Sequence, residues 1–151
     1  MTPPKTVPMP PVADDGDLPR ALVPAAWPRP IGYSNGMIAK GRVIVTAGLV
    51  GWDVMGNFPD SFAGQARQLF NNMLAVLAEG GAGPEHIVRL TWYVVDLDEY
   101  RASLRELGRA YREIIGAHYP AMAVVQVSAL MEDEAKVEIE TTAVVPEEKR
   151  P

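Results

Sequence analysis

The sequence predicts an α+β domain in the order β-β-α-β-α-β-β, with two helices on one face of a mixed sheet. Residues 61–80 and 99–116 repeat apolar side chains every three or four positions, which is the period of an amphipathic helix. Shorter stretches around them alternate apolar and polar residues or form brief apolar runs beside glycine, as strands do. A chain of 151 residues, 48% hydrophobic and 22% charged, has the size and composition of one soluble domain.

The first 30 residues differ from the remainder of the chain. Nine of the fourteen prolines lie there, and no apolar period is sustained. Because proline removes backbone donors, we expect an extended arm that packs on a neighbouring subunit, or a partly disordered tail. Its most apolar stretch, residues 21–27, is the part expected to be anchored. One domain is then expected over residues 31–146, with a short C-terminal tail at 147–151.

Two strands and a helix are predicted in the first half of the domain. Residues 37–39 and 43–47 are short apolar runs next to glycine, which favours strands, and a loop then extends to residue 60. The helix is expected to begin at Ser61, whose hydroxyl can cap it, and to end at Gly80. Its apolar stripe consists of Phe62, Ala66, Leu69, Phe70, Met73 and Leu77.

A strand and a second helix follow. Apolar side chains alternate with polar ones over residues 88–94, which predicts a half-buried strand. The second helix is expected to be capped by Asp96 or Asp98 and closed by Gly116. Its apolar stripe consists of Tyr100, Leu104, Leu107, Tyr111, Ile114 and Ile115.

Two further strands are predicted at residues 123–129 and 137–145. Since both helices cover the same face of the sheet, the other face has to be covered in another way. Several positions expected on it are apolar, namely Val95, Val124 or Val125, and Val144. An apolar open face usually meets a partner, and a closed homo-oligomer is the economical solution.

Composition and charge exclude several classes of function. A net charge of −5, from 14 basic and 19 acidic residues, argues against a nucleic-acid partner. The absence of cysteine excludes disulfides and thiolate chemistry, and His86 and His118 have no partners at metal-ligand spacing, so no metal site is expected. No signal peptide or membrane helix is expected either, which makes the cytoplasm the expected location.

Eight short pieces occur in order at regular spacing: Gly32-Tyr33-Ser34, 43–48, 65–72, 77–83, 86–89, 94–97, Pro120-Ala121 and Val137-Glu138-Ile139-Glu140. Together they resemble the RidA/YjgF (reactive-intermediate deaminase) family over about residues 31–145. The resemblance implies a two-layer, chorismate-mutase-like fold and a homotrimer that binds a small molecule in clefts between subunits. It also implies hydrolysis of enamine or imine intermediates to ammonia and a 2-keto acid, without a metal or an organic cofactor.

The resemblance also assigns candidate site residues. Tyr33, Gly48 and Glu138 match residues that line the family's cleft. A carboxylate such as that of Glu138 can activate water for attack on an imine carbon, and the Tyr33 hydroxyl can donate to a polar substrate atom. The alternatives are a solvated charge on an alternating strand for Glu138 and a core tyrosine with a satisfied hydroxyl for Tyr33.

Other positions depart from the family. Its carboxylate-clamping arginine is Met122 here, its serine is Ala47, and a frequent cysteine or threonine is Val124. Methionine offers no donor, and loss of such a clamp on a desolvated carboxylate costs about 2–5 kcal/mol. Trp52, on the loop expected at the rim of the cleft, is either an aromatic wall for a planar ligand or a packed subunit contact. These residues predict a more apolar cleft than in typical members.

The cleft therefore either binds an uncharged ligand or takes its cation from another position. Arg105, Arg109 and Arg112 lie on the second predicted helix, where they either supply that cation or form a solvated face. An asparagine that many members carry in this helix has no counterpart near Gly108.

Three functions follow from these observations. The leading hypothesis is a hydrolytic deaminase of an enamine or imine other than the usual 2-aminoacrylate. The alternative is a non-catalytic trimer that holds an apolar or aromatic metabolite in its clefts. An endoribonuclease activity, attached to some relatives, is disfavoured because phosphate affinity comes chiefly from Lys and Arg and this chain is acidic.

Overall fold

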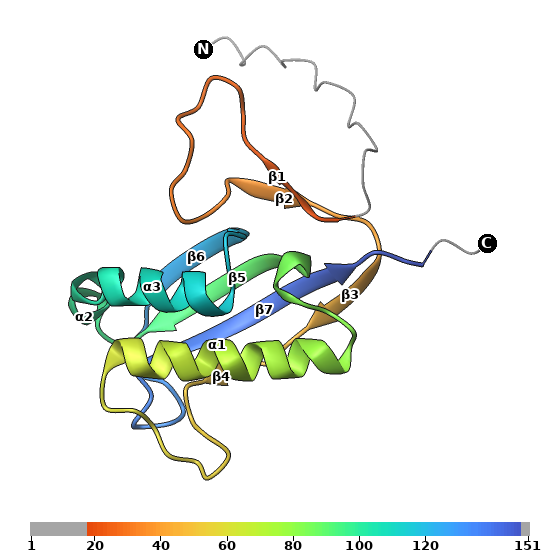
Figure 1. Cartoon of the computed structure of the whole chain (residues 1–151). Helices are drawn as coiled ribbons and strands as arrows, with labels where there is room; N and C mark the ends of the chain where they lie inside the picture. Colours follow the sequence, from red (N-terminus) through yellow and green to blue (C-terminus); the bar gives the residue numbers. More distant parts are fainter. Residues whose placement is uncertain (1–17, 149–151) are drawn as a thin grey trace.

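In the computed structural model, which describes residues 18–148, helices pack on one face of a mixed five-stranded sheet (Figure 1). The sheet runs β3 (Arg42–Val45), β7 (Val137–Val145), β5 (Ile87–Val94) and β6 (Ala121–Gln126), and β4 (Leu49–Val50) also pairs with β7. The β5–β6 pair is parallel and the pairs that involve β7 are antiparallel. The predicted α+β class and mixed sheet are confirmed.

The helical layer contains three helices instead of the two predicted. They are α1 (Phe62–Glu79), α2 (Leu97–Ala102) and α3 (Leu104–Ile114). The second predicted helix is divided at Ser103, whose hydroxyl donates to the Glu99 carbonyl at 2.8 Å. A serine that bonds back to a carbonyl one turn earlier competes with the helical ladder, and here α3 starts anew from Ser103.

Both predicted ends of α1 are confirmed. The Ser61 hydroxyl accepts the Gly64 N–H at the start of the helix, and Gly80 caps its end. Gly81 follows with a φ of 76°, a left-handed conformation that glycine adopts without steric cost. A 3₁₀ turn at Pro84–His86 then leads into β5.

The structure contains the predicted strands, with three differences in position or pairing. The segment expected at 123–129 forms β6 two residues earlier, because its pairing with β5 begins at Ala121 opposite Arg89. β4 lies within the expected loop. β2 (Gly36–Ile38) belongs to a different sheet from β3, since it pairs only with β1 (Arg20–Leu22).

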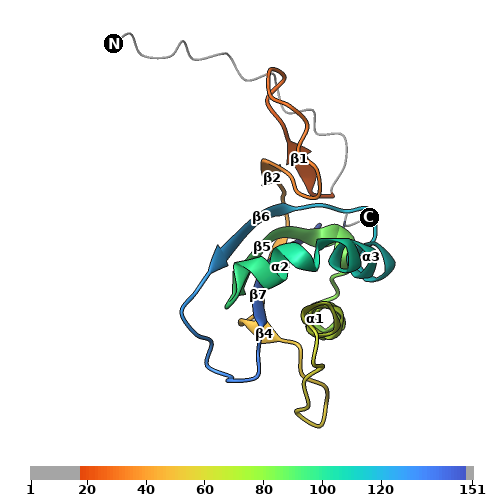
Figure 2. The ribbon, with the colours of Figure 1, turned by 90° about the vertical axis from the view of Figure 1, so that its left-hand side faces the viewer.

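The hairpin of β1 and β2 extends away from the main sheet (Figures 1 and 2). β1 lies inside the proline-rich arm, and the boundary expected at residue 30 falls between the two strands. Within the stretch expected to be anchored, Ala21 pairs with Met37, whereas Trp27 is 58% exposed. The predictions for residues 1–17 and for 149–151 of the tail lie outside the described residues.

The core lies between the helices and the sheet. Leu69, Phe70 and Met73 of α1 are fully buried, as are Leu90 of β5 and Ile139 of β7. Burying each such side chain contributes about 1.5–3 kcal/mol relative to leaving it in water.

Gln65 is a polar residue within this core, 1% exposed. Its side chain donates to the Pro59 and Glu134 carbonyls at 3.0 and 2.9 Å and accepts the Lys136 N–H at 2.8 Å. It therefore ties the loop before α1 to the loop before β7, which explains a glutamine in this part of the helix.

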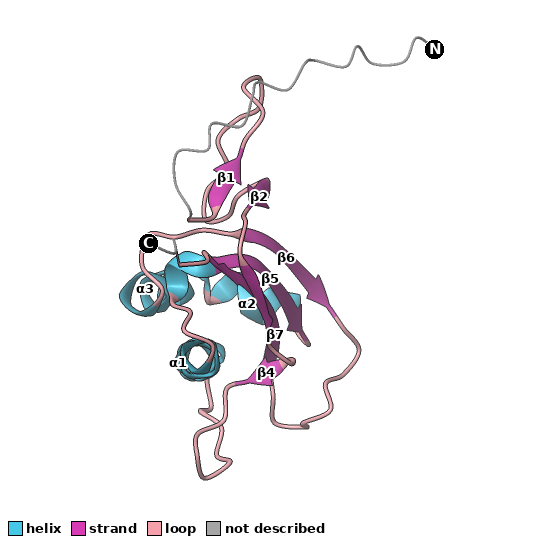
Figure 3. Ribbon diagram, turned by 90° about the vertical axis from the view of Figure 1, so that its right-hand side faces the viewer, coloured by secondary structure: helices cyan, strands magenta, loops and turns pink. Residues whose placement is uncertain are grey.

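The opposite face of the sheet carries no helix or strand of the described chain (Figure 3). Val125, one of the positions predicted for this face, is exposed, and Val43 and Val45 are 65% and 69% exposed. Val124 is not on it, because it pairs with Trp92 and packs on the core side. Val144 is buried. Among residues 18–148, no helix has both the length and the apolar character needed to cross a bilayer.

Candidate functional site

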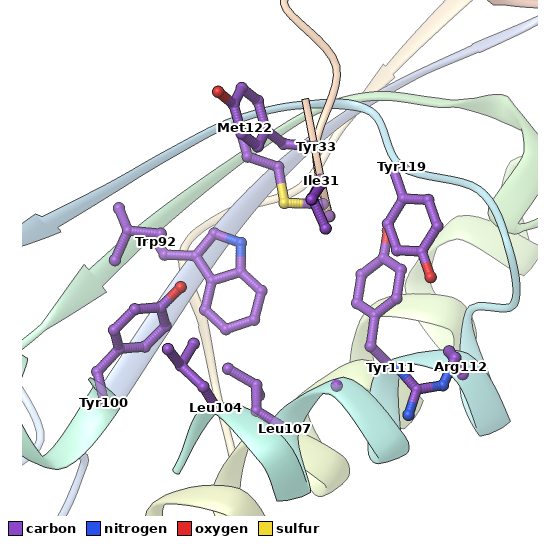
Figure 4. Close-up of a pocket in the computed structure, with 13 residues that line it drawn as sticks. Ile31, Tyr33, Trp92, Tyr100, Leu104, Leu107, Tyr111, Arg112, Tyr119 and Met122 are labelled. Carbon is purple, nitrogen blue, oxygen red and sulfur yellow. The ribbon is translucent and has the colours of Figure 1, made fainter. Parts of the chain in front are cut away.

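A pocket of about 480 Å³ opens between α3, the β5–β6 strand pair and the segment before β2 (Figure 4). This volume lies within the range of small-molecule sites. Its walls are mainly apolar and aromatic. The lining residues are Ile31, Gly32, Tyr33, Trp92, Tyr100, Leu104, Leu107, Gly108, Tyr111, Arg112, Tyr119, Met122 and Val124.

Strand alternation and helix period place these walls. Met122 and Val124 pair with Leu90 and Trp92, so all four side chains point toward the helices. Leu107 and Tyr111 are four residues apart on α3 and therefore share the face that meets them.

Aromatic side chains define the ends of the pocket. The Tyr111 and Tyr119 rings stack with centroids 5.3 Å apart, and the Trp92 and Tyr100 rings meet edge to face at 6.3 Å. The Tyr111 hydroxyl donates to the His118 carbonyl at 2.5 Å. Burial raises the pKa of Tyr111 well above its usual range and also raises the pKa of Tyr100, so both phenols are neutral at physiological pH.

The indole N–H of Trp92 is buried and has no hydrogen-bond partner in the described part of the chain. The indole is 3% exposed and lies against the pocket beside Met122 (Figure 4). A buried donor without an acceptor costs free energy, which an acceptor in this pocket would recover.

The only charged side chain among the lining residues is Arg112. Of the three helix arginines that the sequence offered as a cation, Arg105 does not line this pocket and Arg109 borders a separate surface hollow beside α1. None of the ion pairs found within residues 18–148 involves Arg112.

The rim beside Met122 is held by Ser34, which is buried. Its N–H donates to the Pro120 carbonyl at 3.0 Å and its hydroxyl to the Tyr119 carbonyl at 2.5 Å. These two bonds fix Tyr33 next to β6, with its ring beside Met122 (Figure 4).

The structure divides the site residues predicted from the sequence. Tyr33, Met122 and Val124 line the pocket on the helix side. Glu138 points to the open face, because the residues on either side of it, Val137 and Ile139, are buried in the core. From the sequence alone, all of these residues were assigned to a single cleft.

Gly48 and Ala47 accompany Glu138. A β-carbon added at Gly48 would collide with the Glu138 carboxylate, so the glycine backbone lies directly against it. Hydrogen bonds between Thr46 and Thr141 hold this segment on β7: the Thr46 N–H donates to the Thr141 carbonyl and the Thr46 hydroxyl accepts the Thr141 N–H. Glu138, Gly48 and Ala47 therefore form a second surface.

Trp52 does not line the pocket. It is 41% exposed on the loop after β4, with its ring 5.9 Å from that of Phe58. The Asn72 amide donates to the Val50 and Trp52 carbonyls at 3.0 and 2.8 Å and fixes this loop on α1. A ligand-binding role for Trp52 stays a prediction.

Sequence reasoning did not identify most of the aromatic wall. Tyr100 and Tyr111 were counted only as part of a core stripe, and Trp92 only as a buried strand residue. The sequence pattern that could have identified the wall is three aromatic residues, Trp92, Tyr100 and Tyr111, on elements that face one another around Gly108, which has no side chain. No group of three or more His, Asp or Glu side chains in the described chain is placed to hold a metal ion.

Comparison with known proteins places these features in context. The sequence profile of the Endoribonuclease L-PSP family matches residues 25–145. A RutC family protein from Synechocystis is 34% identical over 127 residues, which cover 81% of this chain and 93% of that protein. The 2-iminobutanoate/2-iminopropanoate deaminase of Escherichia coli is 34% identical over 105 residues, 69% of this chain and 80% of the deaminase.

Solved structures agree with the fold. The Rid family protein YyfB from Yersinia pestis superposes with a TM-score of 0.75 at 30% identity, over 85% of this chain and 99% of that one. TdcF of Escherichia coli, solved with bound serine, gives a TM-score of 0.62 at 28% identity, over 83% of this chain and 98% of TdcF.

Proposed function

Since this chain belongs to the Endoribonuclease L-PSP (RidA/YjgF) family, we propose that it hydrolyses imine or enamine intermediates in clefts between subunits. The observation that carries the proposal is the division of the site between two faces of one sheet. Met122 and Tyr33 lie at the pocket and Glu138 lies on the open face, so one chain cannot bring them to one ligand. Two copies can, if the open face of one meets the pocket side of the next.

A closed trimer is the assembly we propose. Val43, Val45 and Val125 are exposed apolar positions on the open face, where a free surface usually carries polar residues. A cyclic assembly that covers this face repeats each cleft once per subunit.

The names of relatives support the reaction. A deaminase of 2-iminobutanoate and 2-iminopropanoate is 34% identical to this chain, and TdcF, with the same fold, has been solved with a bound amino acid. Both facts favour a small ligand that carries nitrogen on its second carbon.

Glu138 is the proposed base. Its carboxylate takes a proton from water while the hydroxide adds to the imine carbon and the C=N electron pair moves to nitrogen. Glu138 returns that proton to the nitrogen, which gives a carbinolamine. Transfer of the hydroxyl proton to the nitrogen then breaks the C–N bond, as the oxygen lone pair forms the C=O bond, and ammonia leaves. Gly48 contributes by leaving room for the carboxylate.

We propose a substrate with a larger apolar or aromatic side chain than 2-aminoacrylate. Trp92, Tyr100 and Leu104 offer apolar walls, and Met122 adds an adaptable thioether. A three-carbon substrate would leave most of about 480 Å³ unfilled.

The test is ammonia release from freshly generated imines, with 2-aminoacrylate compared with the imine of phenylpyruvate. Wild type is expected to accelerate release from the aromatic imine more strongly, and Glu138→Ala to abolish the acceleration while melting like wild type. No acceleration with either imine, from a protein of trimer mass, would defeat the deaminase proposal.

The alternative is a non-catalytic trimer that binds an apolar or aromatic metabolite. It is favoured by Met122 and Ala47, which remove the family's clamp and hydroxyl. A Met122→Arg variant distinguishes the two. Gain of deaminase activity in an otherwise inert protein favours the binding module, whereas activity in wild type favours the enzyme.

A further inference from the structure

We propose that Arg112 is the anion-binding residue of the pocket, which selects carboxylates with an aromatic or large apolar body. The proposal rests on the proposed function, because it names the substrate class of that same site. It moves the cation from β6, where Met122 stands, to α3 on the facing wall. The ligand would therefore lie with its carboxylate toward the helix.

The first argument is charge. Arg112 is the single charged residue that lines the pocket, and no ion pair within residues 18–148 engages it. By contrast, Arg67 and Arg101 pair with Glu113 and Asp98. A guanidinium without a carboxylate partner at the edge of an apolar pocket favours an anion, which it binds through two parallel hydrogen bonds.

The second argument is the space at Gly108, one turn before Arg112. A β-carbon added at Gly108 would lie 3.4 Å from the Arg112 Nη1 atom, so the guanidinium lies over the glycine. Both residues line the pocket. Glycine within a helix costs about 1 kcal/mol relative to alanine, and here it leaves the pocket wall beside the guanidinium without a side chain.

The third argument is the shape of the remaining wall. Beyond Arg112 the pocket is bounded by Leu104, Leu107 and Trp92, which suit an aromatic ring. Trp92, whose buried N–H has no acceptor within residues 18–148, belongs to this wall.

A purely structural role for Arg112 makes a different prediction. Arg112 lies in the last turn of α3, where a cation stabilises the helix dipole. If that were its whole role, substitutions would change thermal stability and leave ligand affinity unaltered.

The experiment is calorimetric titration of the full-length protein with phenylpyruvate and with its uncharged methyl ester. Wild type is expected to bind phenylpyruvate at least about tenfold more tightly than the ester. Arg112→Met is expected to lose about tenfold in affinity for the acid and little for the ester, and Arg112→Lys to lose less. Arg105→Met, on the same helix but off the pocket, is the matched control and should bind like wild type.

Two further variants separate ligand binding from folding. Gly108→Ala should raise the melting temperature through helix propensity, and the methyl group that it adds to the pocket wall beside Arg112 should lower the affinity for phenylpyruvate. In Arg112→Met/Met122→Arg, the cation returns to the strand and affinity for phenylpyruvate should recover to within about threefold of wild type.

The outcomes distinguish this inference from the proposed function. If phenylpyruvate binding depends on Arg112 but no imine is hydrolysed, the result supports the anion site and contradicts the deaminase proposal. If the wild type hydrolyses imines and Arg112→Met binds the acid as tightly as the wild type, the result contradicts the anion site and supports the deaminase proposal. Failure of wild type to bind phenylpyruvate, or equal affinity for acid and ester, overturns the inference.

Discussion

Tyr93 and Glu138 stand directly opposite each other on β5 and β7, so both side chains lie on the open face of the sheet. The Tyr93 hydroxyl donates to Glu140 at 2.6 Å, and that bond raises the pKa of Tyr93. Trp92, the preceding residue, points to the pocket on the other face. Two neighbouring residues of β5 thus mark the two surfaces that the proposed cleft combines.

Glu138→Gln keeps the size of the side chain and removes the base. We expect ammonia release to fall by about 100-fold or more with an unchanged melting temperature, since general bases contribute factors of this size. Glu140→Gln, on the same face of β7 and bonded to Tyr93, is the matched control and should stay within about threefold of wild type. Equal losses in both variants would indicate an effect of surface charge rather than a base.

Gly48→Ala places a methyl group against the Glu138 carboxylate. We expect kcat to fall about tenfold to 100-fold, because a displacement of about 1 Å at a reacting group has effects of this order. Gly36→Ala is a suitable control, since its methyl group would make only ordinary contact with Leu22, at 3.6 Å. A Gly48→Ala enzyme with normal kcat would separate Glu138 from the chemistry.

Gln65→Leu removes three hydrogen bonds and leaves the Pro59 and Glu134 carbonyls and the Lys136 N–H without partners. We expect the free energy of unfolding to fall by about 2–4 kcal/mol, measured by urea denaturation. Gln68→Leu, three residues along α1, removes a single hydrogen bond, to Asn72, and should lower it by about 1 kcal/mol or less.

Stability at alkaline pH depends on Tyr111. Burial raises the pKa of Tyr111, whereas the unfolded phenol ionises near pH 10. The contribution of the protonated Tyr111 side chain to the free energy of unfolding is therefore complete below about pH 10. It is lost as the pH rises toward the raised pKa. Melting curves from pH 8 to pH 11 should show a smaller alkaline loss in Tyr111→Phe. At pH 8 this variant should be less stable by about 1 kcal/mol, because the bond to the His118 carbonyl is gone.

Assembly is tested on the open face. Val45→Glu places a charge where the proposed trimer is apolar, and light scattering should report a lower mass for this variant than for wild type. Val54, fully exposed on the loop after β4, provides the control, since Val54→Glu should keep the wild-type mass. A wild-type monomer would contradict the proposed cleft.

Local patterns predicted much of this fold. The period of α1, its Ser61 cap and the alternation of β5 and β7 are properties of neighbouring residues, and the structure confirms them. The break at Ser103 and the pairing of β2 with β1 depend on competing hydrogen bonds, which residue order alone does not reveal.

The site was less predictable for a similar reason. Family position identified Tyr33, Met122 and Glu138, but not that they lie on opposite faces, because that depends on strand register. Tyr111 and Trp92 look like core residues in the sequence. Only the packing of α3 against β5 and β6 shows that they border a pocket.

The division of the site between two faces has a genetic consequence. A Glu138→Gln subunit still carries an intact pocket, and an Arg112→Met subunit still carries an intact Glu138. In the proposed trimer, co-expression of these two impaired chains would place an intact pocket opposite an intact Glu138 in some clefts. Two defective alleles would then complement each other within one oligomer, although neither restores the other when the purified proteins are kept apart.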